Sequence, residues 1–310
     1  MNLALLAAGA ALLIVPAWTA PLGRRLLPRD WARLTAASLW IGLLTVRLGL
    51  LATAAPTLLR AAGVHALAAA CHEALGPSTP GGAVSGWAGA IALVVVQTRI
   101  LRAHRRSRSQ LRACRVEPWL GRHHDERGSE LVIVPAPQPV AYAVGGPVPQ
   151  VVVSEGLVQV LTPDELTAVI QHERCHLRYG HHRYMQVGLA VDAAFGDLPV
   201  VRRSTTTLRL AVERWADEAA ADQTCRATLR RALEKVVVSM LDAVPAFTTA
   251  ETICERLDAL DADPQAVSVG WRCAAALPAL GLVAVVAAGL VIGGIPVHHG
   301  ALGLVGYCPV

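Results

Sequence analysis

Charged residues are scarce in this chain of 310 residues: they make up 16% of the sequence, and aromatic residues make up 4%. Hydrophobic residues account for 54%, and the mean hydropathy is +0.44. An ordinary water-soluble protein carries more charge than this, so the composition excludes that class and predicts a membrane protein.

Paired cysteine motifs are also missing. The seven cysteines are odd in number and scattered along the chain, and no two of them form a C-x-x-C pair. This pattern argues against structural disulfides, so we expect reduced and mostly buried thiols.

No basic segment precedes the first apolar run, residues 2–20, as it would in a cleaved signal peptide. The basic residues follow the run instead, at Arg24, Arg25, Arg29 and Arg33. We favour a retained transmembrane helix with its N-terminus outside the cell, and a signal peptide is the alternative.

Three further runs are long enough to span a bilayer, at about residues 34–59, 83–101 and 274–295. The densest basic block follows the third run and consists of Arg102, Arg105, Arg106, Arg108, Arg112 and Arg115. By the positive-inside rule the basic loops are cytoplasmic, which predicts a multi-pass cell-membrane protein with both termini outside. A nucleic-acid-binding patch is the alternative, but no aromatic residues interleave with these arginines, so we expect no direct nucleic-acid binding.

Arg47 stands near the middle of the second run. An arginine inside the membrane marks a functional site by default, although it can also face the helix bundle or reach toward the interface. Asp192 is a candidate partner, and the sequence leaves the role of Arg47 open.

The composition becomes that of a globular domain between the third and fourth runs. Two β-rich segments, Leu131–Pro135 and Gln150–Ser154, flank a turn-rich stretch that could be an exposed sheet edge. His123, His124 and Asp125 are expected in a solvated loop. We therefore predict a mainly α protein with four transmembrane helices (about 2–20, 34–59, 83–101 and 274–295). Residues 1–103 hold three of them, 104–268 form an α+β domain inserted between helices three and four, and 269–310 hold the fourth helix and a short external tail.

One helix of this domain is predicted to carry a metal site. Thr162 and Glu165 have the spacing of a capping box, Pro163 suits the first helical position, and Gly180 is a plausible stop. Inside lies H-E-x-x-H, with His172 and His176 four residues apart. Side chains at that spacing share one helix face, so both imidazoles can reach one cation.

Glu173 lies beside the two histidines, where it can hold and deprotonate a water molecule at the metal. It falls within the apolar arc of the same helix, formed by Leu166, Val169, Ile170 and Leu177. Burying a lone carboxylate there would be costly, and a nearby cation would supply its partner. The alternative is that so short a motif arises by chance, so the rest of the chain must supply a third ligand.

Glu213 is the natural third ligand, in the segment V-E-R-W-A-D-E of a later predicted helix. Two histidines and one glutamate leave a fourth position for water, which is the arrangement of a catalytic zinc site. Asp217 lies four residues further on the same face, where it can orient a ligand histidine. The alternative for both carboxylates is an ordinary solvated helix face.

The motifs P-V-A-Y-A-V-G-G, V-V-V-S-E-G-L, L-T-P-D-E-L-T-A-V-I-Q-H-E-R-C-H and E-R-W-A-D occur in this order. The chain resembles the integral-membrane gluzincin metallopeptidases in this respect. Three predicted spans before the zinc motifs and one after them resemble the BlaR/MecR-type antirepressor peptidases, and the segment 252–257 (T-I-C-E-R-L) is similar to a helix of that group. The zinc motifs also look like those of the CAAX prenyl protease and HtpX-type families.

The resemblance implies a zincin-like zinc peptidase domain with one Zn²⁺ per chain. The ion would be bound by His172, His176 and Glu213, with Glu173 as general base and Asp217 in support. The edge Tyr142, Ala143, Val144, Gly145 would receive the backbone of a protein or peptide substrate as an added strand. In the antirepressor group a large external sensor domain follows the last span, whereas this chain ends at Val310. The resemblance therefore implies a peptidase module without that sensor.

The resulting hypothesis is a membrane-embedded zinc metalloendopeptidase that hydrolyses peptide bonds of a protein substrate at the cytoplasmic face. Regulatory proteolysis is one role that the resemblance implies, with a transcriptional repressor as a candidate substrate. Tyr179, His181 and His182 are candidate oxyanion stabilisers, among which the sequence does not choose. The alternative from another class is a catalytically silent membrane sensor or scaffold that keeps the zinc-peptidase fold. The intact Glu173 argues against it, because a purely structural zinc site has no need of that carboxylate.

Overall fold

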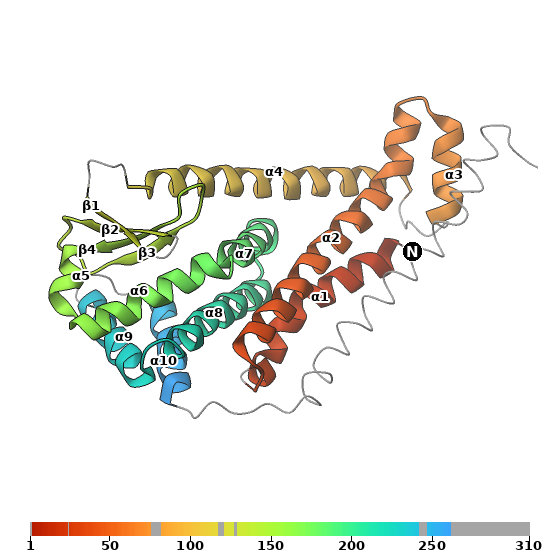
Figure 1. Ribbon diagram of the computed structural model, residues 1–310. Helices are drawn as coiled ribbons and strands as arrows, with labels where there is room; N and C mark the ends of the chain where they lie inside the picture. The colour runs from red at the N-terminus through yellow and green to blue at the C-terminus, as the bar shows by residue number, and fades with distance from the viewer. Residues whose placement is uncertain are drawn as a thin grey trace, which may run out of the picture.

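The computed structural model describes residues 2–23, 25–75, 82–116, 121–126, 129–241 and 247–261. Within these ranges the chain is mainly helical with one small sheet, as the sequence predicts (Figure 1). The expected fourth span, residues 274–295, and the tail after it lie outside the described residues.

The N-terminal part consists of helices α1 (Asn2–Gly23), α2 (Pro28–Ala61), α3 (His65–Leu75) and α4 (Ala83–Ala113). Of these, α1, α2 and α4 are long and apolar enough to cross a bilayer, which agrees with the first three predicted spans. Helix α4 continues without a break through residue 104, where the globular domain was expected to begin. Arginine is a good helix former, so the basic block prolongs the apolar helix instead of ending it.

Helices α1 and α2 approach closely because glycines stand where they cross. A Cβ atom on Gly9 would lie 2.7 Å from a methyl group of Val46, and one on Gly42 would lie 3.0 Å from the Gly9 carbonyl oxygen. Ser38 donates a hydrogen bond of 2.7 Å to the carbonyl oxygen of Leu12. Contacts of this kind hold helices together in a bilayer, where lipid tails are as apolar as the helices themselves.

A four-stranded sheet follows α4, with strand order β1-β2-β4-β3. Its strands are β1 (Arg122–Glu126), β2 (Ser129–Val134), β3 (Ala141–Val144) and β4 (Gln150–Ser154). Strand β4 is fully buried and pairs in parallel with β2, while β1 and β3 pair antiparallel with their neighbours. The predicted edge is therefore present as β3. The prediction of a solvated loop at residues 123–125 is wrong, because those residues form β1.

The remaining helices are α5 (Glu155–Val160), α6 (Pro163–Arg178), α7 (His181–Phe195), α8 (Pro199–Ala221), α9 (Arg226–Leu241) and α10 (Phe247–Asp261). One apolar core lies between the sheet and α6 and includes Val151, Val153 and Val169. A second core joins the membrane helices to α7 and α8, through residues such as Leu39 and Leu208. The elements that carry the predicted site are thus packed against both the sheet and the membrane helices.

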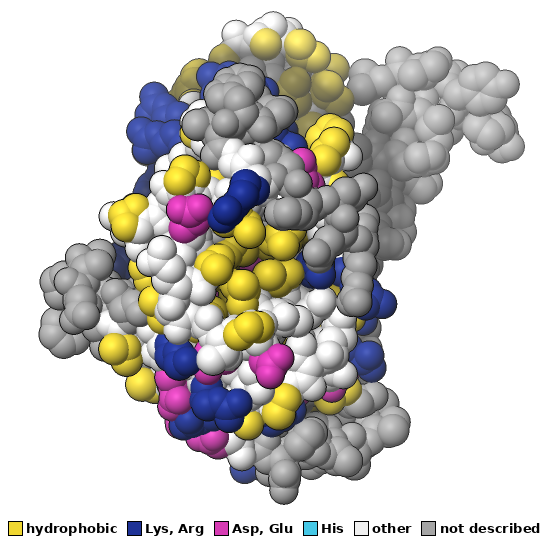
Figure 2. Space-filling model, turned by 60° about the vertical axis from the view of Figure 1, so that its left-hand side comes forward, with side chains coloured by type: hydrophobic (Ala, Val, Ile, Leu, Met, Phe, Trp, Pro, Cys, Tyr) yellow, Lys and Arg dark blue, Asp and Glu magenta, His cyan; other side chains and the backbone are white. Residues whose placement is uncertain are grey.

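Figure 2 shows the molecule from the side on which the sheet lies. On this face, charged side chains of both signs surround an apolar centre. The outer faces of α2 and α4 differ, because they expose large apolar side chains such as Trp40, Leu48, Trp87 and Ile91. Mixed charge suits water, and an apolar helix surface suits lipid.

Asp192 is not the partner of Arg47, as the sequence suggested it could be. Its carboxylate accepts a hydrogen bond of 2.5 Å from Thr205 and pairs with Arg209. Arg47 is half-buried and lines a groove of about 390 Å³ between α2 and α4, together with Gln97 and several leucines.

Candidate metal centre

Helix α6 begins and ends where the sequence predicts. The Thr162 hydroxyl accepts from the Glu165 amide and the Glu165 carboxylate accepts from the Thr162 amide, which completes a capping box. Pro163 occupies the first turn, and Gly180 follows the helix in the left-handed conformation at φ 64°. These signals fix the register in which His172, Glu173 and His176 face one side.

The two histidines and Glu213 converge across the contact between α6 and α8. The Nε2 atoms of His172 and His176 lie 3.1 Å apart, and they lie 3.5 and 3.6 Å from the carboxylate oxygens of Glu213. One ligand atom from each of the three residues lies within 4.8 Å of the others. Two imidazoles and one carboxylate are a donor set that fits Zn²⁺ and leaves a fourth position for water.

Asp217 and Arg256 stand behind the three converging residues. An oxygen of Asp217, which is 2% exposed, lies 2.9 Å from Nδ1 of His172. Arg256, on α10, donates hydrogen bonds of 2.8 and 2.7 Å to the two Asp217 oxygens, and its Nη1 lies 3.1 Å from Glu213. Because the Asp217 contact occupies Nδ1, it orients His172 so that Nε2 faces the centre of the cluster.

The pKa values follow from this geometry. Burial alone would lower the pKa of His172, but Asp217 and Glu213 raise it to about 10. Burial lowers the pKa of His176 to about 4. Burial would raise the pKa of both carboxyls, yet His172 and Arg256 hold the pKa of Glu213 and that of Asp217 below their usual ranges. The cluster therefore presents ionised carboxylates to a cation at neutral pH.

Glu173 lies beside the cluster, at the edge strand. Its carboxylate accepts a hydrogen bond from the backbone amide of Ala143, and burial raises its pKa. These groups share a cleft of about 370 Å³. Helices α6, α7 and α8 line it together with Ser107 and Leu111 of α4. The sheet edge contributes Ala141, Tyr142, Ala143 and Gly145. The structure thus brings Glu173, His172, His176 and Glu213 to one cleft with the predicted edge. Val144, the remaining residue of that edge, is buried.

The three candidate oxyanion stabilisers occupy different places. His181 is 1% exposed, and its Nδ1 lies 3.0 Å from Nδ1 of His176, so it contacts a predicted ligand directly. Tyr179 packs on Trp215, with ring centroids 5.1 Å apart. His182 is exposed and lines the cleft, so it is the candidate with an accessible side chain there.

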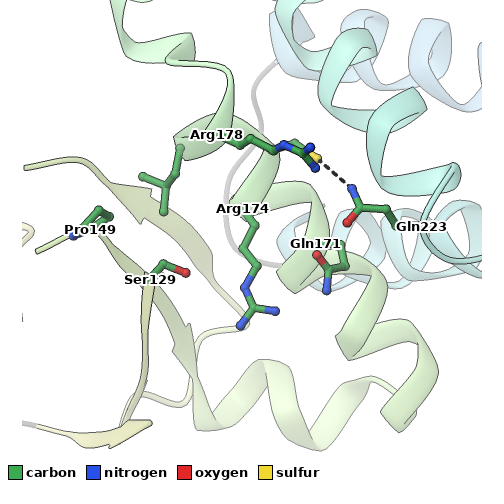
Figure 3. A pocket seen from close by; sticks show the side chains of 8 residues that line it. Ser129, Pro149, Gln171, Arg174, Arg178 and Gln223 are labelled. Atoms are coloured by element: carbon green, nitrogen blue, oxygen red, sulfur yellow. Dashed lines mark hydrogen bonds between the residues drawn. The ribbon is translucent and has the colours of Figure 1, made fainter. Parts of the chain in front are cut away.

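A second pocket, of about 460 Å³, lies against the other face of α6 (Figure 3). Its lining includes Gln171, Arg174, Cys175 and Arg178 of α6, with Gln223 close to the Cys175 sulfur. Residues 171, 174, 175 and 178 point away from residues 172, 173 and 176 on a helix of 3.6 residues per turn. None of the predicted ligands lines this pocket.

Sequence reasoning missed the part played by Arg256. The segment T-I-C-E-R-L resembles a helix of the antirepressor group, but that resemblance gives its arginine no role. A buried carboxylate at Asp217 that supports a histidine needs a second charge or donor, and that requirement is the signal that could have prompted a search for a cation.

The sequence model of Peptidase family M48 matches residues 108–263, about half of the chain. The chain belongs to peptidase family M48. Members of this family are zinc metallopeptidases, which agrees with the donor set of His172, His176 and Glu213. The matched range runs from the basic end of α4 to the end of α10, so it contains the whole cluster and its supporting residues.

A curated protein of Thermoplasma acidophilum, described as a protease HtpX homolog, is 38% identical over 74 residues. The alignment covers 23% of this chain and 22% of that protein. The crystal structure of S. mikatae Ste24p is similar over 72% of this chain and 66% of that one, with 18% identity and a TM-score of 0.35. Besides the family match, three helices among the described residues are long and apolar enough to span a bilayer.

Proposed function

We propose that the chain is a zinc-dependent endopeptidase whose single Zn²⁺ is held by His172, His176 and Glu213. The observation that carries the proposal is the convergence of these three donors within 4.8 Å, with Glu173 next to them on α6. When bound, Zn²⁺ supplies a Lewis acid that polarises a peptide carbonyl and acidifies water.

Glu173 is the proposed general base. It takes a proton from the attacking water and returns it to the leaving amine, so a single carboxylate serves both halves of peptide hydrolysis. Burial raises its pKa, which makes it a better base than a solvated carboxylate. The Ala143 amide holds the carboxylate at the edge strand, where the peptide bond has to lie.

Asp217 and Arg256 keep the metal ligands in place. Asp217 fixes the ring of His172, and Arg256 neutralises Asp217 and contacts Glu213. A buried carboxylate without that cation would carry a large desolvation cost, so the pair supports the charge that orients the histidine.

The substrate is proposed to be a protein or peptide that adds a strand to β3 along Tyr142, Ala143, Val144 and Gly145. Strand β3 has a ladder partner, β4, on one side, and residues of β3 line the cleft at Glu173. Strand addition supplies main-chain hydrogen bonds of fixed direction, and it tolerates many side-chain sequences. An exposed histidine, His182, is the proposed stabiliser of the developing oxyanion.

The placement in the membrane follows from the arginine-rich ends of the spans. We propose residues 1–103 and 269–310 as the membrane parts, with a fourth helix at about 274–295, and 104–268 as a peptidase domain at the cytoplasmic face with both termini outside. The expected arrangement of three spans before the zinc motifs and one after them, with the segment 252–257, supports a BlaR/MecR-type role in regulatory proteolysis. A transcriptional repressor is the candidate substrate, and no direct binding of nucleic acid is proposed.

The test measures zinc content and cleavage together. The full chain, purified in detergent or lipid, is incubated with an unfolded generic protein before and after removal of metal with a chelator. Cleavage that disappears with the chelator and returns with one equivalent of Zn²⁺ supports the endopeptidase. A chain that binds one equivalent of Zn²⁺ and cleaves neither this substrate nor membrane proteins would support the silent scaffold instead.

A further inference from the structure

Helix α4 reaches from the membrane helices to the sheet as one continuous helix (Figure 1). The three residues that follow it, Cys114–Val116, lie against strands β3 and β4 and the turn between them. Five hydrogen bonds make this connection, and Arg115 donates two of them. The membrane part and the candidate substrate edge are therefore joined by direct contacts.

Arg115 binds the turn that connects β3 to β4. Its Nη1 donates 2.9 Å to the carbonyl oxygen of Val148, and its Nη2 donates 3.1 Å to that of Gly145. Gly146 lies between them at φ 147°, and a Cβ atom there would lie 2.2 Å from the Arg115 guanidinium. A glycine at this position is what allows the guanidinium to reach both carbonyls.

Two further side chains, Tyr142 and Gln150, complete this set of hydrogen bonds, which we call the tie between α4 and the sheet. The Tyr142 hydroxyl, on β3, donates 3.1 Å to the Cys114 carbonyl oxygen. The side-chain amide of Gln150, on β4, accepts 3.3 Å from the Val116 amide and donates 3.2 Å to its carbonyl oxygen. Gln150 is 4% exposed, so water cannot readily replace these two bonds.

The same two elements also line one cleft. Ser107 and Leu111 of α4 face it together with Tyr142 and Ala143 of β3, and Ser107 lies 3.4 Å from Gln186 of α7. The position of α4 relative to β3 therefore sets the room that a substrate strand has beside Glu173.

We propose that Arg115 is a positioning residue, through which the membrane helix α4 holds the substrate-binding strand β3 at the cleft. The inference rests on the proposed function, in which β3 receives the substrate. A tilt or shift of α4 in the bilayer would move the edge strand and change substrate binding, while the metal ligands on α6 and α8 would stay in place.

The first test compares steady-state cleavage by Arg115→Ala with that by Arg112→Ala, which removes the same charge from the exposed last turn of α4. We expect Arg115→Ala to raise KM about fivefold with kcat within about twofold, as the loss of two exposed hydrogen bonds predicts. Arg112→Ala should leave both values unchanged, and Arg115→Lys should recover part of the loss. Gln150→Leu removes the buried half of the tie and should raise KM in the same way.

The second test does not depend on activity. Backbone hydrogen exchange of residues 141–148 should be faster in Arg115→Ala than in the wild type, with α6 unchanged. In lipids of different chain length, wild-type exchange in this segment should depend on bilayer thickness, and the variant should lose that dependence. Equal exchange in wild type and Arg115→Ala, or cleavage with unchanged KM in both Arg115→Ala and Gln150→Leu, would overturn the inference. A wild type that cleaves nothing would instead count against the proposed function, and the exchange measurement would still judge the tie.

Discussion

Helix α6 has one face that carries His172, Glu173 and His176 and an opposite face that carries Gln171 and Cys175. The pocket on the second face is the larger, at about 460 Å³ against about 370 Å³ for the cleft. Charged groups from α8 and α10 and an amide from β3 converge on the first face, whereas the predicted ligands are absent from the lining of the second. Convergence of polar groups, and not the volume of the hollow, locates the chemistry.

Titration behaviour separates the two faces further. Burial raises the pKa of the Cys175 thiol to about 11, so this sulfur stays protonated and unreactive at neutral pH. On the other face, carboxylates raise the pKa of His172 to about 10 against the effect of burial. The second face thus carries an unreactive thiol beside two arginines, Arg174 and Arg178, whereas the first face brings together charges of both signs.

Removing a ligand should give the largest difference between the faces. Glu213→Ala deletes the carboxylate that completes the donor set, so we expect loss of zinc and of cleavage to background. Glu218→Gln is the matched control on α8, because that carboxylate pairs with Arg226 instead. Zinc content by elemental analysis and cleavage of the unfolded substrate are the measurements. Full zinc occupancy in Glu213→Ala would show that another residue is the third ligand.

Removing the support behind a ligand should have a smaller effect. Asp217→Asn keeps the shape of the side chain but loses the charge that faces Nδ1 of His172 and Arg256. We expect zinc affinity to fall about 10- to 100-fold, the range found when outer partners of metal ligands are replaced. Competition with a chelator of known affinity measures it, and an unchanged affinity would contradict the assigned role of Asp217.

The pH dependence of zinc binding follows from the raised pKa of His172. Without the metal this histidine keeps its proton up to about pH 10, and zinc must displace that proton to bind. Apparent affinity should therefore rise as pH rises, by about tenfold per unit between pH 6 and 8, after correction for the buffer. In Asp217→Asn the pKa of His172 falls, so the rise should be shallower above neutral pH. An affinity for zinc that does not change with pH would show that His172 carries no proton in the metal-free protein.

A change on the opposite face should have the smallest effect. Arg178→Gln alters the lining of the larger pocket and leaves the cluster untouched. We expect zinc affinity and kcat/KM to stay within about twofold of the wild type, as for surface substitutions in general. A large loss of kcat/KM in this variant would contradict the functional difference between the two faces of α6 and would show that the second pocket takes part in catalysis.

The sequence predicts most of the local elements because their signals are local. The capping box at Thr162 and Glu165, the spacing of His172 and His176, and the β-rich runs all act over a few residues. The convergence of Glu213 with the histidines was a prediction from residue types, and the structure places these residues together.

Contacts between distant segments were harder to predict. Arg256 follows Asp217 by 39 positions, and one arginine among many carries no sign of which carboxylate it will meet. The sequence suggested Arg47 as the partner of Asp192, but the packing of α7 on α8 places Arg209 beside it instead. The tie between Arg115 and the β3–β4 turn likewise depends on where a long helix ends in space.

The replacement Glu173→Gln tests the central claim most directly. Glutamine keeps the size of the side chain but cannot take a proton from water. Zinc stoichiometry and cleavage are measured on one preparation of the full chain, with wild type and Arg178→Gln beside it. The account predicts one equivalent of Zn²⁺ in all three proteins and cleavage reduced to background in Glu173→Gln alone. Cleavage at the wild-type rate by zinc-loaded Glu173→Gln would contradict it.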